Sequence, residues 1–499
     1  MKDWTTMLIL FVAGVFFSCE DYLRVNPANV RSVETVEDVR GMLGGYLLTV
    51  KTQTDLMNGQ TTWYGISFFP NGDLLRMFYY YDNSVYALSY LSRKTGQGQQ
   101  EIYLEGKEWQ MKWVHEKIWD NAYQSIGFMN NILYDLDRVE GDAPEKQRLE
   151  GEARVLRCWH IFKLLQYFAP YDDNRLGIPL NLDSEETPDF QGGRWEQTRI
   201  YSVILEELEE VLNFEAAADP DYNLFYNKAV IHALLAQVYQ YKAEGPAKTS
   251  TDWGNARLHA SAAMAGRRLA RTPAELNTLF KASGIGFHAD NPYALLVFFW
   301  DSKDNRGVYG DCRMQWGYPQ TWEASGDPAN GGFEIEPELL AMYSDTDIRM
   351  QDKVYVYDRK HMQIGKYIQQ SYTVRDFYAM FRMADMHLIV AESYCREGDE
   401  DNARKWLQDF KDARQAGPWS SPGILEEILN ERRKEFAFEY DYRWLDMKRN
   451  HLSLTRKYMN PGRGETEVTL EENDYRYNFC IPESSEIGLN RQLEQNAGW

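Results

Sequence analysis

Residues 383–415, which read MADMHLIVAESYCREGDEDNARKWLQDFKDARQ, carry the clearest structural pattern in the chain. Apolar residues recur there at spacings of three and four, on both sides of the turn signal Gly398-Asp399. This period is typical of amphipathic helices, and the glycine favours a chain reversal between them. The apolar positions alternate small and large side chains: Ala384, Leu388, Ala391 and Tyr394, then Ala403, Leu407 and Phe410. The stretch therefore predicts two antiparallel helices whose alanines allow a close approach.

The same pairing recurs at 225–243 and 254–270, with a break at Gly245-Pro246. This alternation matches a tetratricopeptide repeat, in which bulky residues of one helix fill the groove left by small residues of the other. Helical periodicity covers 108–136, 147–168, 197–213, 225–243, 254–270, 383–396, 400–415 and 424–449. We predict a mainly α fold, a tetratricopeptide-like helical-repeat scaffold with long aromatic-rich loops and a few short strands. Spacing alone leaves a generic helical bundle as the alternative.

Two irregular stretches, 58–106 and 283–335, separate the helical segments and are rich in aromatic residues and glycine. Long irregular segments in a compact protein are usually functional or disordered, and the aromatic content argues against disorder. Tyr293–Trp300, YALLVFFW, predicts a strand at the start of the second stretch, and Lys353–Tyr357 is a further strand candidate.

Residues 1–18 are predicted to be a lipoprotein signal peptide. The apolar run Met7–Phe17 is too short to span a bilayer, and Ser18 precedes Cys19 as lipoprotein signal peptidase requires. Cys19 is therefore the expected lipid anchor. The following pair, Glu20-Asp21, resembles the surface-export tag of Bacteroidetes lipoproteins. The alternative is an ordinary secretory signal with a coincidental cysteine.

Composition excludes several partners and sites. The net charge of −21 repels nucleic acid phosphates and anionic membrane surfaces, so we expect no nucleic acid partner and membrane contact through the anchor alone. The remaining cysteines lack zinc-site spacing and are predicted to be free, small buried residues: Cys158, Cys312, Cys395 and Cys480.

Four blocks resemble the SusD-like (RagB/SusD) nutrient-binding lipoproteins of Bacteroidetes. They are Cys19-Glu20-Asp21-Tyr22-Leu23 with Asn26-Pro27; Gly151–Arg157 with Tyr167-Phe168 and Ile178-Pro179-Leu180; Glu431–Glu439 with Arg443–Arg449; and Ile481-Pro482 with Glu486-Ile487, Asn490 and Gln495–Trp499. Small departures are Cys158, Ala497 and Trp499, where the family usually has alanine, proline and tyrosine. The resemblance implies one domain over 19–499, with helical repeats at about 108–270 and 383–449 and ligand loops at about 58–106 and 283–335. It also implies a SusC-like TonB-dependent outer-membrane transporter as partner.

Carboxylates in the 431–449 block indicate a structural ladder rather than catalysis. Glu435 and Glu439 share one face of the expected helix with Arg432 and Arg443, and such a ladder neutralises its own charges. A glycoside hydrolase needs two carboxylates facing each other across a sugar. His115-Glu116 lacks the second histidine of a zinc protease helix. We therefore predict no catalytic residues, no metal ligands and no cofactor, although family members sometimes carry structural calcium.

Aromatic and polar residues in the two loop regions have the chemistry of a glycan site. Sugar rings stack on tryptophan and tyrosine, while aspartate, asparagine and arginine hydrogen bond to their hydroxyls. The candidates are Asp73, Arg76, Tyr79, Tyr81, Asn83, Trp300, Trp316, Tyr318 and Trp322. The alternative is that these aromatic residues pack the loops onto the scaffold.

Together these features predict a non-catalytic, surface-exposed outer-membrane lipoprotein that captures oligosaccharides and delivers them to its transporter. Three alternatives stay open: the same fold binding peptides, a helical-repeat scaffold that binds other proteins, and a glycoside hydrolase. The sequence does not determine the glycan, its linkage or the number of sites.

Overall fold

The computed structural model describes the helical body and the strands that flank the two aromatic-rich stretches. The described residues are 33–52, 84–86, 108–182, 192–219, 225–280, 293–300, 333–352, 354–358, 363–364, 366, 376–437, 439, 441–460 and 463–499.

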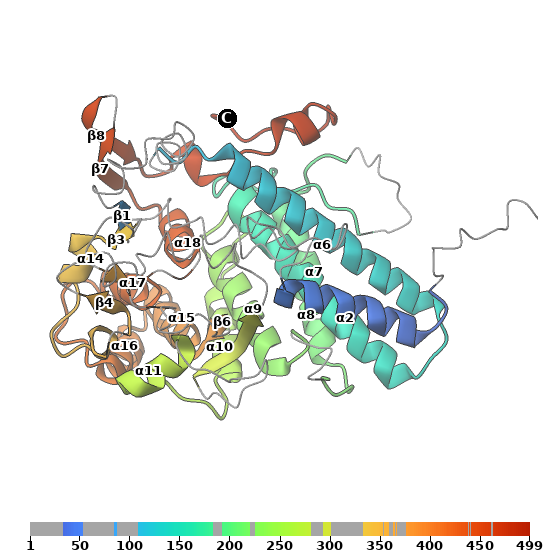
Figure 1. Ribbon diagram of the computed structural model, residues 1–499, viewed down its shortest axis with the longest axis horizontal. Helices are drawn as coiled ribbons and strands as arrows, with labels where there is room; N and C mark the ends of the chain where they lie inside the picture. Colours follow the sequence, from blue (N-terminus) through green and yellow to red (C-terminus); the bar gives the residue numbers. More distant parts are fainter. Residues whose placement is uncertain are drawn as a thin grey trace, which may run out of the picture.

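Helices make up most of this part of the chain (Figure 1). They are α2 (Val36–Thr52), α6 (Lys112–Arg138), α7 (Ala143–Phe168), α8 (Gln197–Leu212), α9 (Lys228–Lys242), α10 (Asp252–Ala263), α11 (Pro273–Phe280), α14 (Pro337–Ala341), α15 (Met383–Arg396), α16 (Glu400–Arg414), α17 (Ile424–Glu435) and α18 (Tyr442–Arg449). Short turns of helix lie at η3 (Ile348–Met350), η4 (Tyr475–Tyr477) and η5 (Glu483–Ile487). The prediction of a mainly α fold is confirmed.

The turn between α15 and α16 shows how local sequence sets the helix ends. Gly398 has a φ of +82°, a left-handed conformation that side-chain-bearing residues rarely adopt. Asp399 then caps α16, because its side chain accepts a hydrogen bond from the backbone N–H of Asn402. The predicted chain reversal at Gly398-Asp399 is therefore present.

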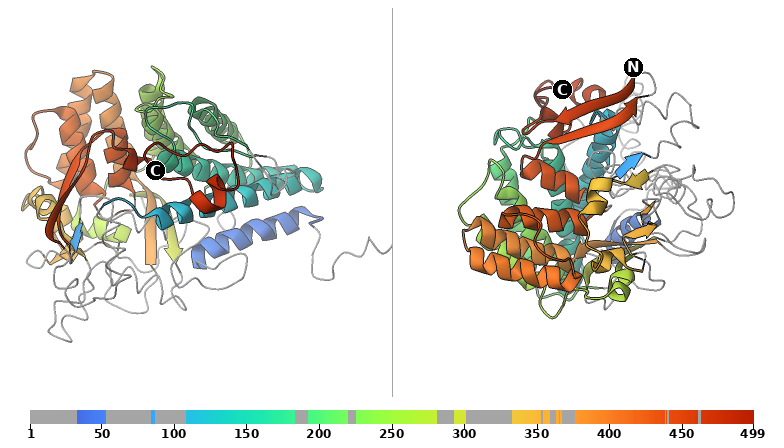
Figure 2. Two further views of the ribbon diagram at one scale, coloured as in Figure 1. Left: turned by 90° about the horizontal axis from the view of Figure 1, so that it is seen from above. Right: turned by 90° about the vertical axis from the view of Figure 1, so that its left-hand side faces the viewer.

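The helices stack in antiparallel pairs. α9 packs against α10, α10 against α15 and α15 against α16, while α6 packs against α7. Figure 2 shows the orange helices α15–α17 beside the green helices α9 and α10. Alanines fill the contacts of α10 and its neighbours, since Ala256, Ala260, Ala391 and Ala403 are all fully buried. This is the small-and-large packing expected of tetratricopeptide-like repeats.

Two helical segments end earlier than their periodicity predicts. The segment predicted over 254–270 stops at Ala263, shortly before Gly266 takes a φ of +73°. The segment predicted over 424–449 is broken into α17 and α18. The backbone oxygens exposed at the break are satisfied by Nζ of Lys366, which donates to Glu435 at 2.7 Å and to Ala437 at 2.8 Å. A lysine at a helix C-terminus supplies the donors that the next helical turn would otherwise give.

The strands of the described residues form four antiparallel two-stranded sheets: β1 (Ser84–Tyr86) with β3 (Phe333–Ile335), β2 (Ala294–Trp300) with β6 (Asp376–Arg382), β4 (Val356–Asp358) with β5 (Gln363–Ile364), and β7 (Leu454–Asn460) with β8 (Gly464–Leu470). The strand predicted at Tyr293–Trp300 is present as β2, and β4 overlaps the candidate at Lys353–Tyr357. The sequence pattern did not predict β1, β3, β5, β6 or the β7–β8 hairpin.

Within the part of the chain that the structure describes, the buried apolar residues form two clusters. The large one fills the helical scaffold from α2 to α18 and continues under the C-terminal residues. The small one lies between α11, β3, α14 and η3 and includes Leu276, Ile335, Leu339, Ile348 and Tyr355. We call these the scaffold core and the small core.

Candidate functional site

The predicted glycan-binding residues fall almost entirely outside the described part of the chain. Trp300 is the exception, because it is the last residue of β2 and pairs with Asp376 of β6. The others are Asp73, Arg76, Tyr79, Tyr81, Asn83, Trp316, Tyr318 and Trp322, and the predicted anchor Cys19 also lies outside the described residues. These assignments remain predictions.

The backbone around these positions links the two aromatic-rich stretches. β1 lies within 58–106 and pairs with β3, which begins within 283–335. The register places Ser84 opposite Ile335 and Tyr86 opposite Phe333. β2 lies within the second stretch and pairs with β6, which leads directly into α15. Two regions far apart in sequence are thus joined at β1–β3 and connected to the scaffold through β6.

A buried ion network fixes β6 to the end of α17. Arg382, the last residue of β6, donates from Nη1 to Oε1 of Glu435 at 2.7 Å and from Nε to Oε2 of Glu439 at 2.9 Å. Lys366 also reaches Oε1 of Glu439 at 2.5 Å, and its Nζ lies 3.6 Å from the ring centroid of Tyr355. All these side chains are buried, so the pairs are shielded from salt and solvent.

Two further arginines complete the network. Arg414 of α16 donates from Nε and Nη2 to the two carboxylate oxygens of Glu435, at 2.8 and 2.9 Å. Arg349 of η3 donates from Nη2 to Glu431 at 2.8 Å and also binds Asp347. Nη1 of Arg349 also lies 3.4 Å from Oε2 of Glu435, so this one carboxylate of α17 contacts residues from η3, β6 and α16.

These contacts correct the expected ladder. The pairing of Glu435 and Glu439 with Arg432 and Arg443 along one helix is wrong, because α17 ends at Glu435. Arg432 instead donates to Asp385 at 2.9 Å and to Asp446 at 2.8 Å. The carboxylate of Glu435 pairs with Arg382 and Arg414, and that of Glu439 pairs with Lys366 and Arg382, all of which come from other segments. One signal could have identified Arg382: it is one of two charged residues, with Asp385, in the largely apolar run 377–391.

The pKa shifts of the glutamates in this network indicate a structural role rather than acid–base catalysis. Burial opposes ionisation of Glu431, but Arg349, Lys434 and Lys411 outweigh it and lower the pKa of Glu431 to about 2. Burial likewise opposes ionisation of Glu435, and Arg414 and Arg382 hold its pKa well below the usual range. A general acid needs a carboxyl with a raised pKa, which is the opposite shift. Carboxyls with raised pKa values do occur at Asp120, Asp135 and Glu486, where burial disfavours the charge.

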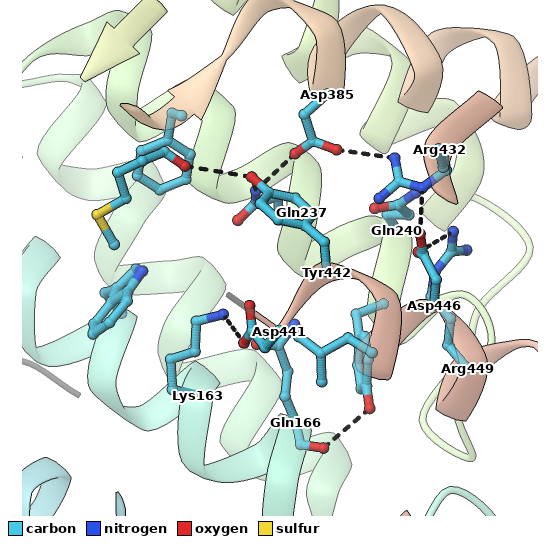
Figure 3. A pocket seen from close by; sticks show the side chains of 15 residues that line it. Lys163, Gln166, Gln237, Gln240, Asp385, Arg432, Asp441, Tyr442, Asp446 and Arg449 are labelled. Carbon is cyan, nitrogen blue, oxygen red and sulfur yellow. Dashed lines mark hydrogen bonds and ion pairs between the residues drawn. The ribbon is translucent and has the colours of Figure 1, made fainter. Parts of the chain in front are cut away.

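A small polar cavity lies where the helical pairs meet β6 (Figure 3). Its volume is about 50 Å³. It is lined by Trp159, Lys163 and Gln166 of α7, Gln237, Gln240 and Tyr241 of α9, Met380 and Phe381 of β6, Asp385 of α15, Arg432 of α17, and Asp441, Tyr442, Leu445, Asp446 and Arg449 at α18. Ligand pockets usually measure about 300–1,000 Å³, so this cavity is far too small for an oligosaccharide. The three carboxyls with raised pKa values, Asp120, Asp135 and Glu486, are not among its lining residues.

His115 and Cys480 pack together in the interior and have no role in chemistry that the structure indicates. His115 is buried, stacks on Phe479 with ring centroids 3.9 Å apart, and has its Nδ1 3.1 Å from Sγ of Cys480. Burial lowers the pKa of His115 to about 3, so the imidazole is neutral. Cys158, Cys395 and Cys480 are free thiols, as predicted, although Cys395 is only half-buried; Cys312 lies outside the described residues.

Within the described ranges, no three His, Cys, Asp or Glu residues are grouped so that they could hold a metal ion. None of the helices described combines the length and apolarity needed to cross a membrane.

Comparison with known proteins gives two matching family models. The model described as "SusD family" matches residues 341–499, and the model described as "Starch-binding associating with outer membrane" matches residues 79–240. The matched ranges together exceed half of the chain. No curated protein matches.

Solved structures share the fold over nearly the whole length. A putative sugar binding protein from Bacteroides vulgatus is 20% identical with a TM-score of 0.69, over 94% of this chain and 100% of that one. A SusD-like carbohydrate binding protein from the same species is 18% identical with a TM-score of 0.66, over 92% and 97%. A SusD superfamily protein from Bacteroides thetaiotaomicron is 17% identical with a TM-score of 0.64, over 93% and 99%.

Proposed function

Because the chain belongs to the SusD/RagB family, we propose that it captures oligosaccharides at the cell surface and delivers them to a TonB-dependent outer-membrane transporter of the SusC type. As a member of this family it is a non-catalytic binding protein. Beyond family membership, we propose the class of ligand, the transporter partner and the cell-surface location, with Cys19 as the lipid anchor.

One structural observation carries the proposal. The pairing of β1 with β3 joins the two aromatic-rich stretches that supply all the predicted sugar-stacking residues. A glycan extends over several sugar units, so aromatic residues from two joined loops can stack on neighbouring units of one ligand. The rigid helical scaffold below β6 would hold these loops in place.

Further support comes from the similar proteins. One matching family model is described as starch-binding and associated with the outer membrane, and two similar solved proteins are described as carbohydrate or sugar binding. The net charge of −21 favours neutral glycans over sulfated or uronic ones. Tethering through Cys19 would keep the ligand loops near the transporter, where a high effective concentration makes weak binding sufficient.

The test is glycan binding by variants that remove the predicted stacking rings. We expect isothermal titration against a panel of neutral oligosaccharides to identify a ligand, and Trp316→Ala with Trp322→Ala to abolish its binding. Trp419→Ala is the matched control, because this half-buried tryptophan follows α16 and donates from Nε1 to Gln408 at 2.9 Å. Its affinity should equal that of the natural protein.

The outcomes separate the alternatives. Unchanged glycan affinity in the double variant would overturn the assignment of these tryptophans. Binding of a peptide library with no glycan binding would favour a peptide carrier, and capture of the transporter alone would favour a protein-interaction scaffold.

A further inference from the structure

The cavity at the centre of the scaffold has the size and polarity of a water site. Its volume of about 50 Å³ compares with the roughly 10–15 Å³ that one water needs by the same measure, so it accommodates a few water molecules. We propose that it binds a cluster of internal waters, which completes the hydrogen bonding between α7, α9 and α18.

The side chain of Gln166 supplies the strongest evidence. Gln166 lines the cavity and is only 5% exposed, yet no donor among the described residues reaches its Oε1. The alternative orientation of the amide would leave a buried nitrogen in the same place. Leaving a buried polar atom unsatisfied destabilises the folded state, whereas a water in the adjoining cavity removes that cost.

Donors as well as acceptors face this space. Nζ of Lys163 donates to Oδ2 of Asp441 at 2.9 Å, and an ammonium group carries three N–H donors. On the opposite wall, Gln237 donates from Nε2 to Oδ2 of Asp385 at 2.8 Å (Figure 3). Gln237 also carries an amide oxygen, which can accept a hydrogen bond. The lining therefore combines amide, carboxylate and ammonium groups. A buried water typically makes about three hydrogen bonds, which such a lining can supply.

The charge balance favours a neutral occupant. The lining contains three cationic groups, Lys163, Arg432 and Arg449, and three anionic groups, Asp385, Asp441 and Asp446. They pair with one another: Lys163 with Asp441, Arg432 with Asp385 and Asp446, and Arg449 with Asp446. An added ion would enter a low-dielectric site whose charges are already matched, at a high desolvation cost. Water has no such cost.

The substitution Gln166→Met tests the proposal through the sign of a stability change. If waters occupy the cavity, the apolar side chain removes one of their partners, and we expect Tm to fall by about 1 °C or more. If the cavity is dry, the same substitution removes an unsatisfied polar atom, and Tm should rise. Gln197→Met is the control, because the buried Gln197 amide donates to the backbone oxygens of Pro170 and Asp173 and its loss must lower Tm in either case.

A crystal structure of the natural protein and of Gln166→Met gives a second, independent result. We expect solvent density beside Gln166 in the natural protein and fewer solvent positions in the variant. Empty density together with a raised Tm would overturn the proposal. An anomalous peak in the cavity after soaking in rubidium chloride would also overturn it, since that would identify a cation site.

Discussion

Two regions of this protein depend on different kinds of interaction. One is the helical scaffold, and the other, which we call the strand-bearing side, consists of β1, β3 and the small core. In the scaffold, α9 with α10 and α15 with α16 are neighbours in sequence and pack through regularly spaced apolar residues. On the strand-bearing side, Ser84 pairs with Ile335, and only a small core lies beneath β3. The first region is specified by local periodicity, and the second depends on contacts between distant segments.

The buried ion network is where the two regions meet. Glu435 belongs to α17 of the scaffold, while Arg382 ends β6, and Arg349 lies in η3 beside the small core. These charge pairs add to the apolar contacts of Leu295, Met380 and Phe381, through which β2 and β6 pack into the scaffold core. If this comparison is correct, this one carboxylate should matter at least as much as a fully buried apolar side chain.

The largest expected effect is therefore that of Glu435→Gln. Removing this charge leaves Arg414 without its two carboxylate contacts and weakens the pairing of Arg382, and breaking a buried pair costs about 3–5 kcal/mol. Urea unfolding measures the loss. Glu483→Gln is the control, because its pair with Lys112 is 2.8 Å long but half exposed, and exposed pairs contribute at most about 1 kcal/mol. Equal losses in the two variants would contradict the role of the network.

The next effect compares the two cores with the same substitution. Leu388 of α15 and Leu339 of α14 are both fully buried, in the scaffold core and the small core respectively. We expect Leu388→Ala to cost about 3–5 kcal/mol and Leu339→Ala about 2–3 kcal/mol, because methionines beside the small core can shift into the space. Urea unfolding measures both losses.

The same two substitutions should affect glycan affinity in the opposite order. Leu339 packs in the same cluster as Ile335 of β3, so Leu339→Ala should lower glycan affinity, while Leu388→Ala should leave it unchanged. This expectation rests on the proposed function. Equal affinity of both variants would mean that the small core does not support the ligand loops.

The difference between the regions also explains what the sequence could predict. The α15–α16 pair was predictable from its alanines and the turn at Gly398, because all of that information lies within one stretch. The break between α17 and α18 was not, because the lysine that satisfies the backbone oxygens there, Lys366, belongs to another segment. The three-residue strand Ser84–Tyr86 is too short to show an alternating pattern.

For the site, residue chemistry predicted which stretches are involved but not how they are arranged. Trp300 was correctly placed in a strand, and its register with Asp376 required the structure. The cavity could not be foreseen, because Lys163, Gln237 and Asp441 are ordinary helix-surface residue types in the sequence. Only the packing of three helices makes them neighbours.

The smallest expected effect is a pH dependence that belongs to the scaffold alone. Burial lowers the pKa of both His115 and His160 from 6.5 to about 3. Each folded-state pKa lies below the unfolded value, so the stabilisation is complete above pH 6.5 and is lost as the pH falls towards 3. Between pH 7 and pH 5 each imidazole should cost roughly 2 kcal/mol of stability.

The ion network should add almost nothing to the change in stability between pH 7 and pH 5. Glu431 has a pKa of 4.5 in the unfolded chain and about 2 in the folded protein, so it is ionised in both states over most of that range. Urea unfolding of His160→Asn at pH 7 and pH 5 measures the difference. We expect the variant to lose about a quarter of the pH dependence, since burial also lowers the pKa values of His115, His259 and His387. A natural protein whose stability is constant from pH 7 to pH 5, and falls only below pH 4.5, would show instead that the charge network, and not the buried imidazoles of the scaffold, controls the response to acid.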